Sequence, residues 1–277
     1  MKRAGVMGWP VAQSRSPVLH RFWLEHYGIE GDYTLLPVPP EALERELRAL
    51  AGRGFAGCNL TLPHKEPSLA LLDRVDATAR RIGAVNTVVA AADGALEGSN
   101  TDAFGFHASL AAALPGWSAA SGPAVVLGAG GSARAVVAAL LDHGAPEIRL
   151  VNRGSARAEA LAAALGGRID ILAWESRADA LAGAALLVNT TSLGMAGQPP
   201  LDLALDALPE GAVVSDIVYV PLRTGLLAAA QARGNPTVDG LGMLLYQAQP
   251  GFAAWFGLWP EVSPALRARV LASLAAP

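Results

Sequence analysis

The sequence predicts an α/β protein of two domains, each built on a mostly parallel sheet. Short apolar runs alternate with helical patterns along most of the chain, which is typical of sheets covered by helices on both faces. The chain has 277 residues, enough for two domains of ordinary size. A stretch rich in Gly, Ser and Pro at residues 114–122 separates a first α/β series from a second one.

The first series combines strands, two helices and a hairpin. We expect Ser16 to cap the helix that begins at Pro17, and Gly28 to follow the end of that helix. Asp93 and Gly94 are expected to form the hairpin turn. The expected strands are residues 3–7, 32–38 and 57–60, the hairpin arms are 85–90 and 95–98, and the helices are 17–27 and 41–51.

The second series alternates regularly between strands and helices. The tail that follows it is helical over residues 241–256 and 264–274 and has no strand pattern. Because such a tail cannot extend a sheet, we expect it to fold back onto the first domain. The expected strands of the series are 123–127, 147–151, 169–172, 185–188 and 212–217, and its helices are 132–142, 156–165 and 222–233.

The composition excludes several classes of protein. Hydrophobic residues make up 52% and charged residues 16%, with a net charge of -3, so the chain has no basic surface for nucleic acid. Cys58 is the single cysteine, which excludes an internal disulfide, and the five histidines show no zinc-binding spacing, so no metal is expected. We see neither a signal-peptide pattern nor an apolar run of about 18 residues, and expect a cytoplasmic protein without membrane contact.

A glycine-rich turn follows the first expected strand of the second series. It contains Gly128, Ala129, Gly130, Gly131, Ser132 and Ala133, which matches the pattern G-x-G-x-x-A between a strand and a helix. Glycines in this position let the backbone approach a pyrophosphate, and the helix N-terminus offers oriented N–H groups. The turn therefore predicts a dinucleotide cofactor.

The residues after the next strand favour one cofactor over another. Asn152 and Arg153 follow that strand, and Arg157 adds a second cation. Folds that bind NAD usually place an acidic residue there for the ribose 2′-hydroxyl, whereas guanidinium groups suit a 2′-phosphate. We therefore predict NADP, the alternative being that both arginines are solvated surface charges.

Lys65 stands out because the chain uses arginine almost everywhere else. Of the 21 basic residues, only Lys2 and Lys65 are lysines. A lysine can release a proton when its surroundings lower its pKa, whereas an arginine stays charged. Lys65 is thus a candidate for proton transfer, the alternative being a chance surface lysine. A carboxylate beside it, such as Asp102, would complete a proton-handling pair, unless Asp102 only caps a helix.

Polar residues gather at the ends of the expected strands of the first series. Ligands of open α/β sheets bind beyond the carboxyl ends of strands, so this clustering predicts a pocket for a polyhydroxylated ligand. Ser14 and Ser16 at the start of the first helix suit a carboxylate, although capping explains Ser16 equally well. The clustered pairs are Asn59 with Thr61, Asn86 with Thr87, and Asn100 with Thr101.

Nine motifs, in this order, resemble the shikimate dehydrogenase family over about residues 5–250. The motifs are Gly8-x-Pro10-x3-Ser14-x-Ser16-Pro17-x2-His20, Asn59-x-Thr61-x-Pro63-x-Lys65, Gly83-Ala84-x-Asn86-Thr87, Asn100-Thr101-Asp102, Gly128-Ala-Gly-Gly-Ser-Ala-Arg134, Asn152-Arg153-x3-Arg157-Ala158, Asn189-Thr-Thr-Ser-x-Gly194-Met195, Asp216-x2-Tyr219-x-Pro221 and Asp239-Gly240-x2-Met243-x3-Gln247. One departure is Ala103, where the family often has glycine, and a methyl group there is a mild change.

The resemblance implies an activity and a domain layout. The activity is reversible reduction of 3-dehydroshikimate to shikimate by NADPH, within aromatic amino acid and chorismate biosynthesis. The layout is an α/β substrate-binding catalytic domain of residues 1–101 plus 238–277, whose C-terminal helices return to it. An NADP-binding Rossmann domain of residues 102–237 is inserted between these parts.

The resemblance also assigns roles to residues. Lys65 and Asp102 are implied as the catalytic pair, and both also bind substrate. The other implied substrate-binding residues are Ser14, Ser16, Asn59, Thr61, Asn86, Tyr219 and Gln247. The implied cofactor-binding residues are Gly128, Ala129, Gly130, Gly131, Ser132, Ala133, Asn152, Arg153, Arg157, Thr190, Ser192, Met195, Gly240 and Met243.

Three alternatives remain at this point. The first is a quinate or quinate/shikimate dehydrogenase, which would differ in the pocket near Ser14 and Ser16. The second is a catalytically silent sensor that binds NADP and a ligand. The third is an unrelated Rossmann reductase that would share only the glycine-rich turn. The apolar tail suits a homodimer, and a buried core explains it equally well.

Overall fold

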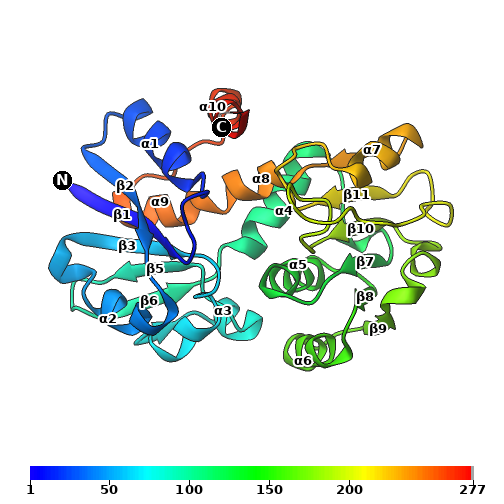
Figure 1. The fold of residues 1–277 in the computed structure, drawn as a ribbon, viewed down its shortest axis with the longest axis horizontal. Coiled ribbons are helices and arrows are strands. Elements are labelled where there is room, and N and C mark those ends of the chain that lie inside the picture. The colour runs from blue at the N-terminus through cyan, green and yellow to red at the C-terminus, as the bar shows by residue number, and fades with distance from the viewer. Residues whose placement is uncertain (276–277) are drawn as a thin grey trace. The chain divides into compact units, whose positions relative to one another are not determined.

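The protein, as a computed structural model that describes residues 1–275, divides into two compact units (Figure 1). Unit 1 comprises Met1–Thr101 and the chain from Leu245 onward, and unit 2 comprises Asp102–Leu244. The chain passes back into unit 1 within α8 (Gly240–Tyr246), whereas the sequence predicts the boundary between residues 237 and 238. The division into a substrate domain and a cofactor domain stays a prediction.

Unit 1 contains a mixed six-stranded sheet. Its strand order is β2-β1-β3-β5-β6-β4, and its strands are β1 (Lys2–Gly8), β2 (Gly31–Pro37), β3 (Phe55–Leu60), β4 (Arg74–Val75), β5 (Thr87–Ala90) and β6 (Leu96–Ser99). The first three strands are parallel, and β5 runs antiparallel to both β3 and β6. The start of β5 therefore lies at the same edge of the sheet as the ends of β3 and β6. The two-residue β4 is too short to give a pattern in the sequence.

Helices from both ends of the chain cover the sheet of unit 1. Its helices are α1 (Ser16–His26), α2 (Leu43–Arg48), α3 (Ala77–Ile82), α9 (Ala248–Phe256) and α10 (Pro264–Ala275). α9 packs on β1, β3 and β5, and α1 packs on β1 and β2 and against α9 and α10 (Figure 1). Trp255 of α9 donates its indole N–H to the carbonyl of Val88 at 3.0 Å. The predicted return of the tail to the first domain is confirmed.

One predicted helix of unit 1 is wrong in extent. Instead of a helix over 41–51, α2 is preceded by a 3-10 turn at Pro40–Ala42 and followed by another at Ala51–Arg53. Gly54 then adopts a left-handed backbone with φ of 76°, which stops the helical path. Leu43, Leu47 and Leu50 are buried in the apolar core of unit 1, together with residues of β1 and β3.

Unit 2 contains a parallel six-stranded sheet. Its strands are β7 (Ala124–Leu127), β8 (Ile148–Asn152), β9 (Ile169–Ala173), β10 (Leu186–Asn189), β11 (Val213–Asp216) and β12 (Thr237–Val238). The sheet order is β12-β11-β10-β7-β8-β9, so the chain winds outward first in one direction and then in the other. This is the doubly wound Rossmann order, and its reversal lies between β7 and β10. The predicted fold class is confirmed, although the two-residue β12 was not expected.

The helices of unit 2 lie along the strands that they connect. They are α4 (Asp102–Ala113), α5 (Gly131–Asp142), α6 (Ser155–Leu165) and α7 (Gly225–Ala232). Only short 3-10 turns, at Trp174–Ser176 and Asp179–Leu181, join β9 to β10. α7 begins three residues after the predicted start at 222, because the Thr224 hydroxyl accepts the Leu227 N–H at 3.3 Å and caps the helix. No helix among residues 1–275 is both long and apolar enough to cross a membrane.

Candidate active site

A row of hydrogen-bonded polar side chains lies at one edge of the unit 1 sheet. Asn59 is the last residue but one of β3, Asn86 immediately precedes β5, and Thr101 lies two residues after β6. The Asn59 Nδ2 donates to the Asn86 carbonyl at 3.0 Å and to the Thr87 hydroxyl at 3.2 Å. The antiparallel hairpin brings these three strand ends together, so residues far apart in the sequence share one network.

Asn86 is the centre of this row. Its Oδ1 accepts the Thr101 backbone N–H at 2.9 Å and the Thr87 hydroxyl at 3.0 Å. Its Nδ2 donates to the Thr101 hydroxyl at 3.0 Å and to Gln247 Oε1 at 3.4 Å. Both oxygen and nitrogen of the buried amide are therefore satisfied, and Gln247 joins the row from the returning tail. Asn100 is instead structural, because its amide donates to the Ala84 carbonyl at 2.9 Å.

The two serines lie at the start of α1 with their hydroxyls close together. Ser14 Oγ lies 3.3 Å from Ser16 Oγ and accepts the Ser16 backbone N–H at 3.4 Å. The expectation that Ser16 caps the helix is wrong, because α1 already begins at Ser16 and no side chain caps it from the N-cap position, Arg15. Ser14 instead binds the first helical N–H. Both hydroxyls thus stand beside the positive end of α1, where a carboxylate is stabilised.

Two buried aromatic residues behind this row were not predicted as site residues. The Tyr33 hydroxyl donates to Asn59 Oδ1 at 2.6 Å, and the Tyr33 ring is fully buried. His20 stacks on that ring, with centroids 4.0 Å apart and planes 7° from parallel. His20 belongs to the first motif, but Tyr33 reads in sequence as an ordinary core residue of β2, so only the structure reveals its polar contact.

Lys65 lies on a loop that is anchored from both sides. The buried His64 ring hydrogen-bonds to the Val38 carbonyl at 2.7 Å, and the Lys65 carbonyl accepts the Val85 N–H at 2.8 Å. The Thr61 backbone N–H donates to the Met7 carbonyl at 2.9 Å, which ties the start of the loop to the end of β1. The Lys65 side chain is half-buried. Asp102, the buried first residue of α4, belongs to unit 2, so its pairing with Lys65 stays a prediction.

The glycine-rich turn of unit 2 joins β7 to the N-terminus of α5. Gly128 has φ of 102°, and a Cβ there would lie 2.8 Å from Thr190 Oγ1, so the protein itself requires glycine. A Cβ on Gly130 or Gly131 would meet nothing within 4 Å. Ala133 is fully buried and packs α5 against the sheet. The turn therefore leaves open space beside the first N–H groups of α5.

The predicted cofactor residues after β8 and β10 lie beside this turn. Thr190 donates its hydroxyl to the Leu127 carbonyl at 2.6 Å, and the Gly128 N–H donates to the Val151 carbonyl at 2.8 Å. The Asn152 amide donates to the Gly154 carbonyl at 2.8 Å and so shapes the loop after β8. Arg153 and Arg157 are exposed, and neither forms an ion pair with an acidic side chain among residues 1–275.

A buried carboxylate fixes the loops after β10 and β11. Asp216 Oδ1 accepts the Asn189 amide and the Val218 N–H, each at 3.0 Å, and Oδ2 accepts the Thr224 hydroxyl at 2.7 Å. The Asp216 side chain is fully buried, and this burial raises the pKa of its carboxyl above the ordinary value. Asn189 Oδ1 in turn accepts the Thr191 hydroxyl at 2.7 Å. The eighth motif contains Asp216, but no role was predicted for it.

The remaining predicted residues of unit 2 lie on the loops after β10 and β11 and on α8. Ser192 and Met195 are exposed on the loop after β10, which is tied to the loop carrying Tyr219 by a bond from the Ala196 N–H to the Val220 carbonyl at 2.8 Å. Gly240 begins α8, where a Cβ would collide with the Ile217 carbonyl. Met243 is buried on the same helix.

Family comparisons agree over both units. The model "Shikimate dehydrogenase substrate binding domain" matches residues 6–88, and "Shikimate / quinate 5-dehydrogenase" matches residues 110–195. Among curated proteins, the NADP(+) shikimate dehydrogenase of Paramagnetospirillum magneticum is 63% identical over 268 residues, covering 97% of each chain. The chain belongs to the shikimate dehydrogenase family.

Two solved structures illustrate the range of this family. The shikimate 5-dehydrogenase of Thermus thermophilus, in complex with NADP(H) and shikimate, is 42% identical with a TM-score of 0.86, covering 99% of this chain and 100% of that one. The quinate dehydrogenase of Corynebacterium glutamicum, in complex with NAD, is 33% identical with a TM-score of 0.90. The match covers 98% of this chain and 100% of that one. Family membership rules out the third alternative, an unrelated reductase.

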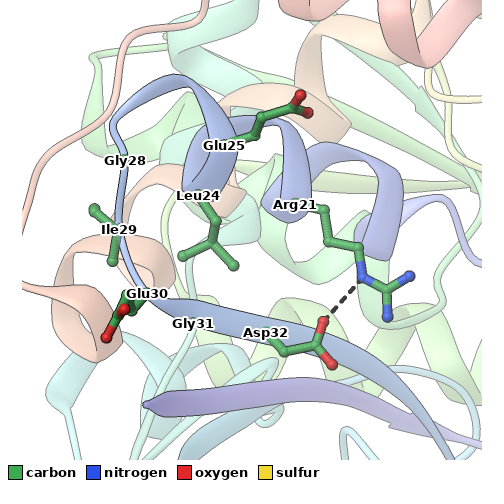
Figure 2. Close-up of a pocket in the computed structure, with 8 residues that line it drawn as sticks. All are labelled: Arg21, Leu24, Glu25, Gly28, Ile29, Glu30, Gly31 and Asp32. Carbon is green, nitrogen blue, oxygen red and sulfur yellow. Dashed lines mark hydrogen bonds and ion pairs between the residues drawn. The ribbon is translucent and has the colours of Figure 1, made fainter.

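A separate surface groove contains none of the predicted site residues of this shikimate dehydrogenase family member. Figure 2 shows it between the end of α1 and the start of β2, beside the ion pair of Arg21 and Asp32. The groove has a volume of about 500 Å³, and the two charged groups lie 3.0 Å apart. Among residues 1–275, no three His, Cys, Asp or Glu side chains gather in a way that could hold a metal ion.

The raised pKa of Asp216 predicts a pH-dependent contribution to stability. In the folded protein the carboxyl keeps its proton to a higher pH than in the unfolded chain, whose ordinary value is 3.8. The contribution is therefore fully present below that value and is lost as pH rises through the folded pKa. Asp216→Asn cannot ionise, so the stability of the wild type relative to this variant should fall as pH rises. Denaturant unfolding from about pH 4 to about pH 7 measures this difference.

Asp170→Asn is the matched control for that experiment. Asp170 is exposed on β9, so its replacement should leave the pH dependence of unfolding nearly unchanged. A stability difference between wild type and Asp216→Asn that stays constant with pH would contradict the raised pKa.

Proposed function

We propose that this protein is an NADP-dependent oxidoreductase that reversibly reduces 3-dehydroshikimate to shikimate, in the biosynthesis of chorismate and the aromatic amino acids. The observation that carries the proposal is the row of polar side chains centred on Asn86 in unit 1. Three strand ends and the returning tail meet there, and the row stands in a chain whose relatives are shikimate dehydrogenases. Unit 1 is then the substrate-binding catalytic domain and unit 2 the NADP-binding domain.

The residues of unit 1 suit a hydroxylated ring acid. Ser14 and Ser16 offer two hydroxyls beside the positive end of α1, which stabilises a carboxylate. We assign the ring hydroxyls of the substrate to Asn59, Thr61, Asn86, Asp102 and Gln247, with Tyr219 as a further contact. A pocket built to hydrogen-bond hydroxyl groups rejects analogues that lack them, because its own polar groups would stay unpaired.

The residues of unit 2 suit NADP. Nothing in the packing of the protein requires glycine at Gly130 or Gly131, whereas a pyrophosphate over the α5 N-terminus would need that space. Arg153 and Arg157 are two exposed cations at the end of β8, where a ribose 2′-phosphate would bind. Ser192 and Met195 lie on the same loop after β10 as Thr190.

Lys65 and Asp102 are the proposed catalytic pair. Bound NADPH supplies the hydride, which adds to the C3 carbonyl carbon of the substrate. Negative charge grows on the carbonyl oxygen, and Lys65 donates a proton to that oxygen or stabilises the charge. Asp102 holds the Lys65 ammonium and a substrate hydroxyl. The ketone is thereby reduced to an alcohol and NADPH is oxidised to NADP⁺.

A quinate or quinate/shikimate dehydrogenase is the second candidate. One matching family model carries both substrates in its name, and the Corynebacterium glutamicum structure is a quinate dehydrogenase in complex with NAD. Quinate has an extra hydroxyl on the carbon that carries the carboxylate, so the surroundings of Ser14 and Ser16 decide between them. The two exposed arginines after β8 favour NADP and thus shikimate. A cytoplasmic location and a homodimer remain predictions.

Absorbance at the NADPH band tests this proposal directly. Purified protein is mixed with shikimate or quinate, each with NADP⁺ or NAD⁺. We expect strong turnover only with shikimate and NADP⁺, because the substrate row and the two arginines select one partner each. Strong turnover of quinate with NAD⁺ would favour the second candidate. No turnover in any mixture, with NADP⁺ binding retained, would indicate a silent sensor.

Replacement of Lys65 tests the proton-transfer role. Lys65→Ala should lower kcat by about 10²–10⁴, the usual worth of general acid–base catalysis, and leave NADP⁺ binding nearly intact. Steady-state kinetics measure kcat, and a fluorescence titration measures NADP⁺ binding. Lys2→Ala removes the only other lysine and should behave as wild type. Near-normal turnover in Lys65→Ala would refute the role, and high activity in Lys65→Arg would favour charge stabilisation over proton transfer.

Replacement of Arg153 tests the 2′-phosphate contact. Arg153→Ala should raise KM for NADP⁺ by roughly tenfold to a hundredfold, the usual cost of a lost charged hydrogen bond, with little change for NAD⁺. Arg168→Ala is a matched control, since Arg168 is an exposed arginine just before β9, at the opposite edge of the same sheet. Equal increases in KM for NADP⁺ and NAD⁺ would argue against a contact between Arg153 and the 2′-phosphate.

A further inference from the structure

The Tyr33 hydroxyl is the partner of one proposed substrate contact. It donates to Asn59 Oδ1 at 2.6 Å, and both residues are buried. Asn59 begins the row proposed for the ring hydroxyls of the substrate. Tyr33 lies on β2 and Asn59 on β3, on either side of β1, so the bond joins residues that are far apart in the sequence.

The hydrogen-bond direction around Asn59 is fixed by its partners. The Asn86 carbonyl can only accept, so the Asn59 Nδ2 must face it, at 3.0 Å. The Asn59 Oδ1 then faces Tyr33, which must donate. Burial raises the pKa of the Tyr33 phenol well above its ordinary value, so the phenol keeps its proton. The single hydrogen of this hydroxyl is committed to Asn59.

The Tyr33 ring is held in place by its packing. Tyr33 and His20 are both fully buried, and their rings stack 4.0 Å apart. Trp255 packs on the same ring, with centroids 6.0 Å apart. Burial lowers the His20 pKa to about 3, so the stack stays uncharged near neutral pH. The phenol oxygen therefore has a fixed position beside the Asn59 amide.

We propose that Tyr33 is a positioning residue whose buried hydroxyl fixes the orientation of the Asn59 amide. An amide that is already held in one orientation can bind a hydroxyl of a ring acid without first having to be ordered. The inference rests on the proposed function for the identity of that ligand. The residue does not touch the ligand itself but acts through Asn59.

Tyr33→Phe tests this inference because it removes one hydroxyl and leaves the ring. The Asn59 Oδ1 then loses its donor and the amide is free to turn, so we expect KM for shikimate to rise about tenfold. The kcat and the KM for NADP⁺ should change much less, because Lys65 and the cofactor residues are untouched. Steady-state kinetics and a calorimetric titration with shikimate measure the split. An unchanged KM and Kd for shikimate would overturn the inference.

Tyr27→Phe is the matched control. Tyr27 follows α1 in the same unit, and its hydroxyl accepts the Glu261 N–H at 2.9 Å, away from the polar row. It should lose a hydrogen bond with no change in KM for shikimate. Equal effects of the two replacements would identify a general loss of stability and overturn the inference.

A double replacement separates action through Asn59 from a diffuse effect. In an Asn59→Ala background, Tyr33→Phe should have little further effect on shikimate affinity, because the acceptor is already gone. Fully additive effects of Tyr33→Phe and Asn59→Ala on shikimate affinity would overturn the inference. If Tyr33→Phe does not fold, Asn59→Ala alone must still lose shikimate affinity selectively, and its retention would overturn the inference too. Wild-type protein that neither binds nor oxidises shikimate refutes the proposed function, whereas normal wild type with normal Tyr33→Phe refutes only this inference.

Discussion

The amide of Asn86 is the constraint on which the site of unit 1 depends. Asn86 precedes β5. Its side-chain oxygen and nitrogen bind Thr101, which follows β6, and its nitrogen also binds Gln247 in the returning tail. Its backbone carbonyl also accepts the Leu60 N–H at 2.8 Å, at the end of β3. A buried polar group costs free energy unless it is satisfied, so the four segments are held in one arrangement. The row of polar side chains is therefore part of what makes this edge of the sheet fold as it does.

In unit 2, the buried carboxyl group of Asp216 has the role that the Asn86 amide has in unit 1. Asp216 accepts three hydrogen bonds and thereby joins the loops after β10 and β11. Burial of its carboxyl costs more than burial of an amide, as its raised pKa indicates, and the three donors offset part of that cost. The loop bearing Thr190 is fixed next to Gly128 in consequence. In both units, a polar side chain at a strand end positions loops that the sheet alone would leave unordered.

The sequence predicted what depends on local pattern and missed what depends on tertiary neighbours. The strands, the turn at Gly128 and the returning tail follow from apolar spacing, glycine placement and the absence of a strand pattern. The two-residue strands β4 and β12 carry no such pattern, because their pairing is decided by the strands beside them. Ser16 resembled a cap, but Ser14 binds the first helical N–H instead. Tyr33 could not be found at all, since a tyrosine in a buried strand shows its hydroxyl partner only after β1 and β3 are placed.

The two units differ in how they would recognise a ligand, and the difference follows from burial. In unit 1 most of the proposed contacts are neutral side chains, and Lys65 is the charged one. Asn59, Asn86 and Ser16 are buried, so they would discriminate by leaving polar groups unpaired when the wrong ligand binds. In unit 2 the proposed selective groups are exposed arginines, whose attraction for a phosphate is weakened by salt, since the screening length is about 10 Å at 0.1 M. Cofactor preference should therefore weaken as ionic strength rises, while preference among ring acids should hold. With these residues in their proposed roles, substrate specificity depends on buried contacts of unit 1, whereas cofactor specificity depends on surface charge that can change without disturbing a core.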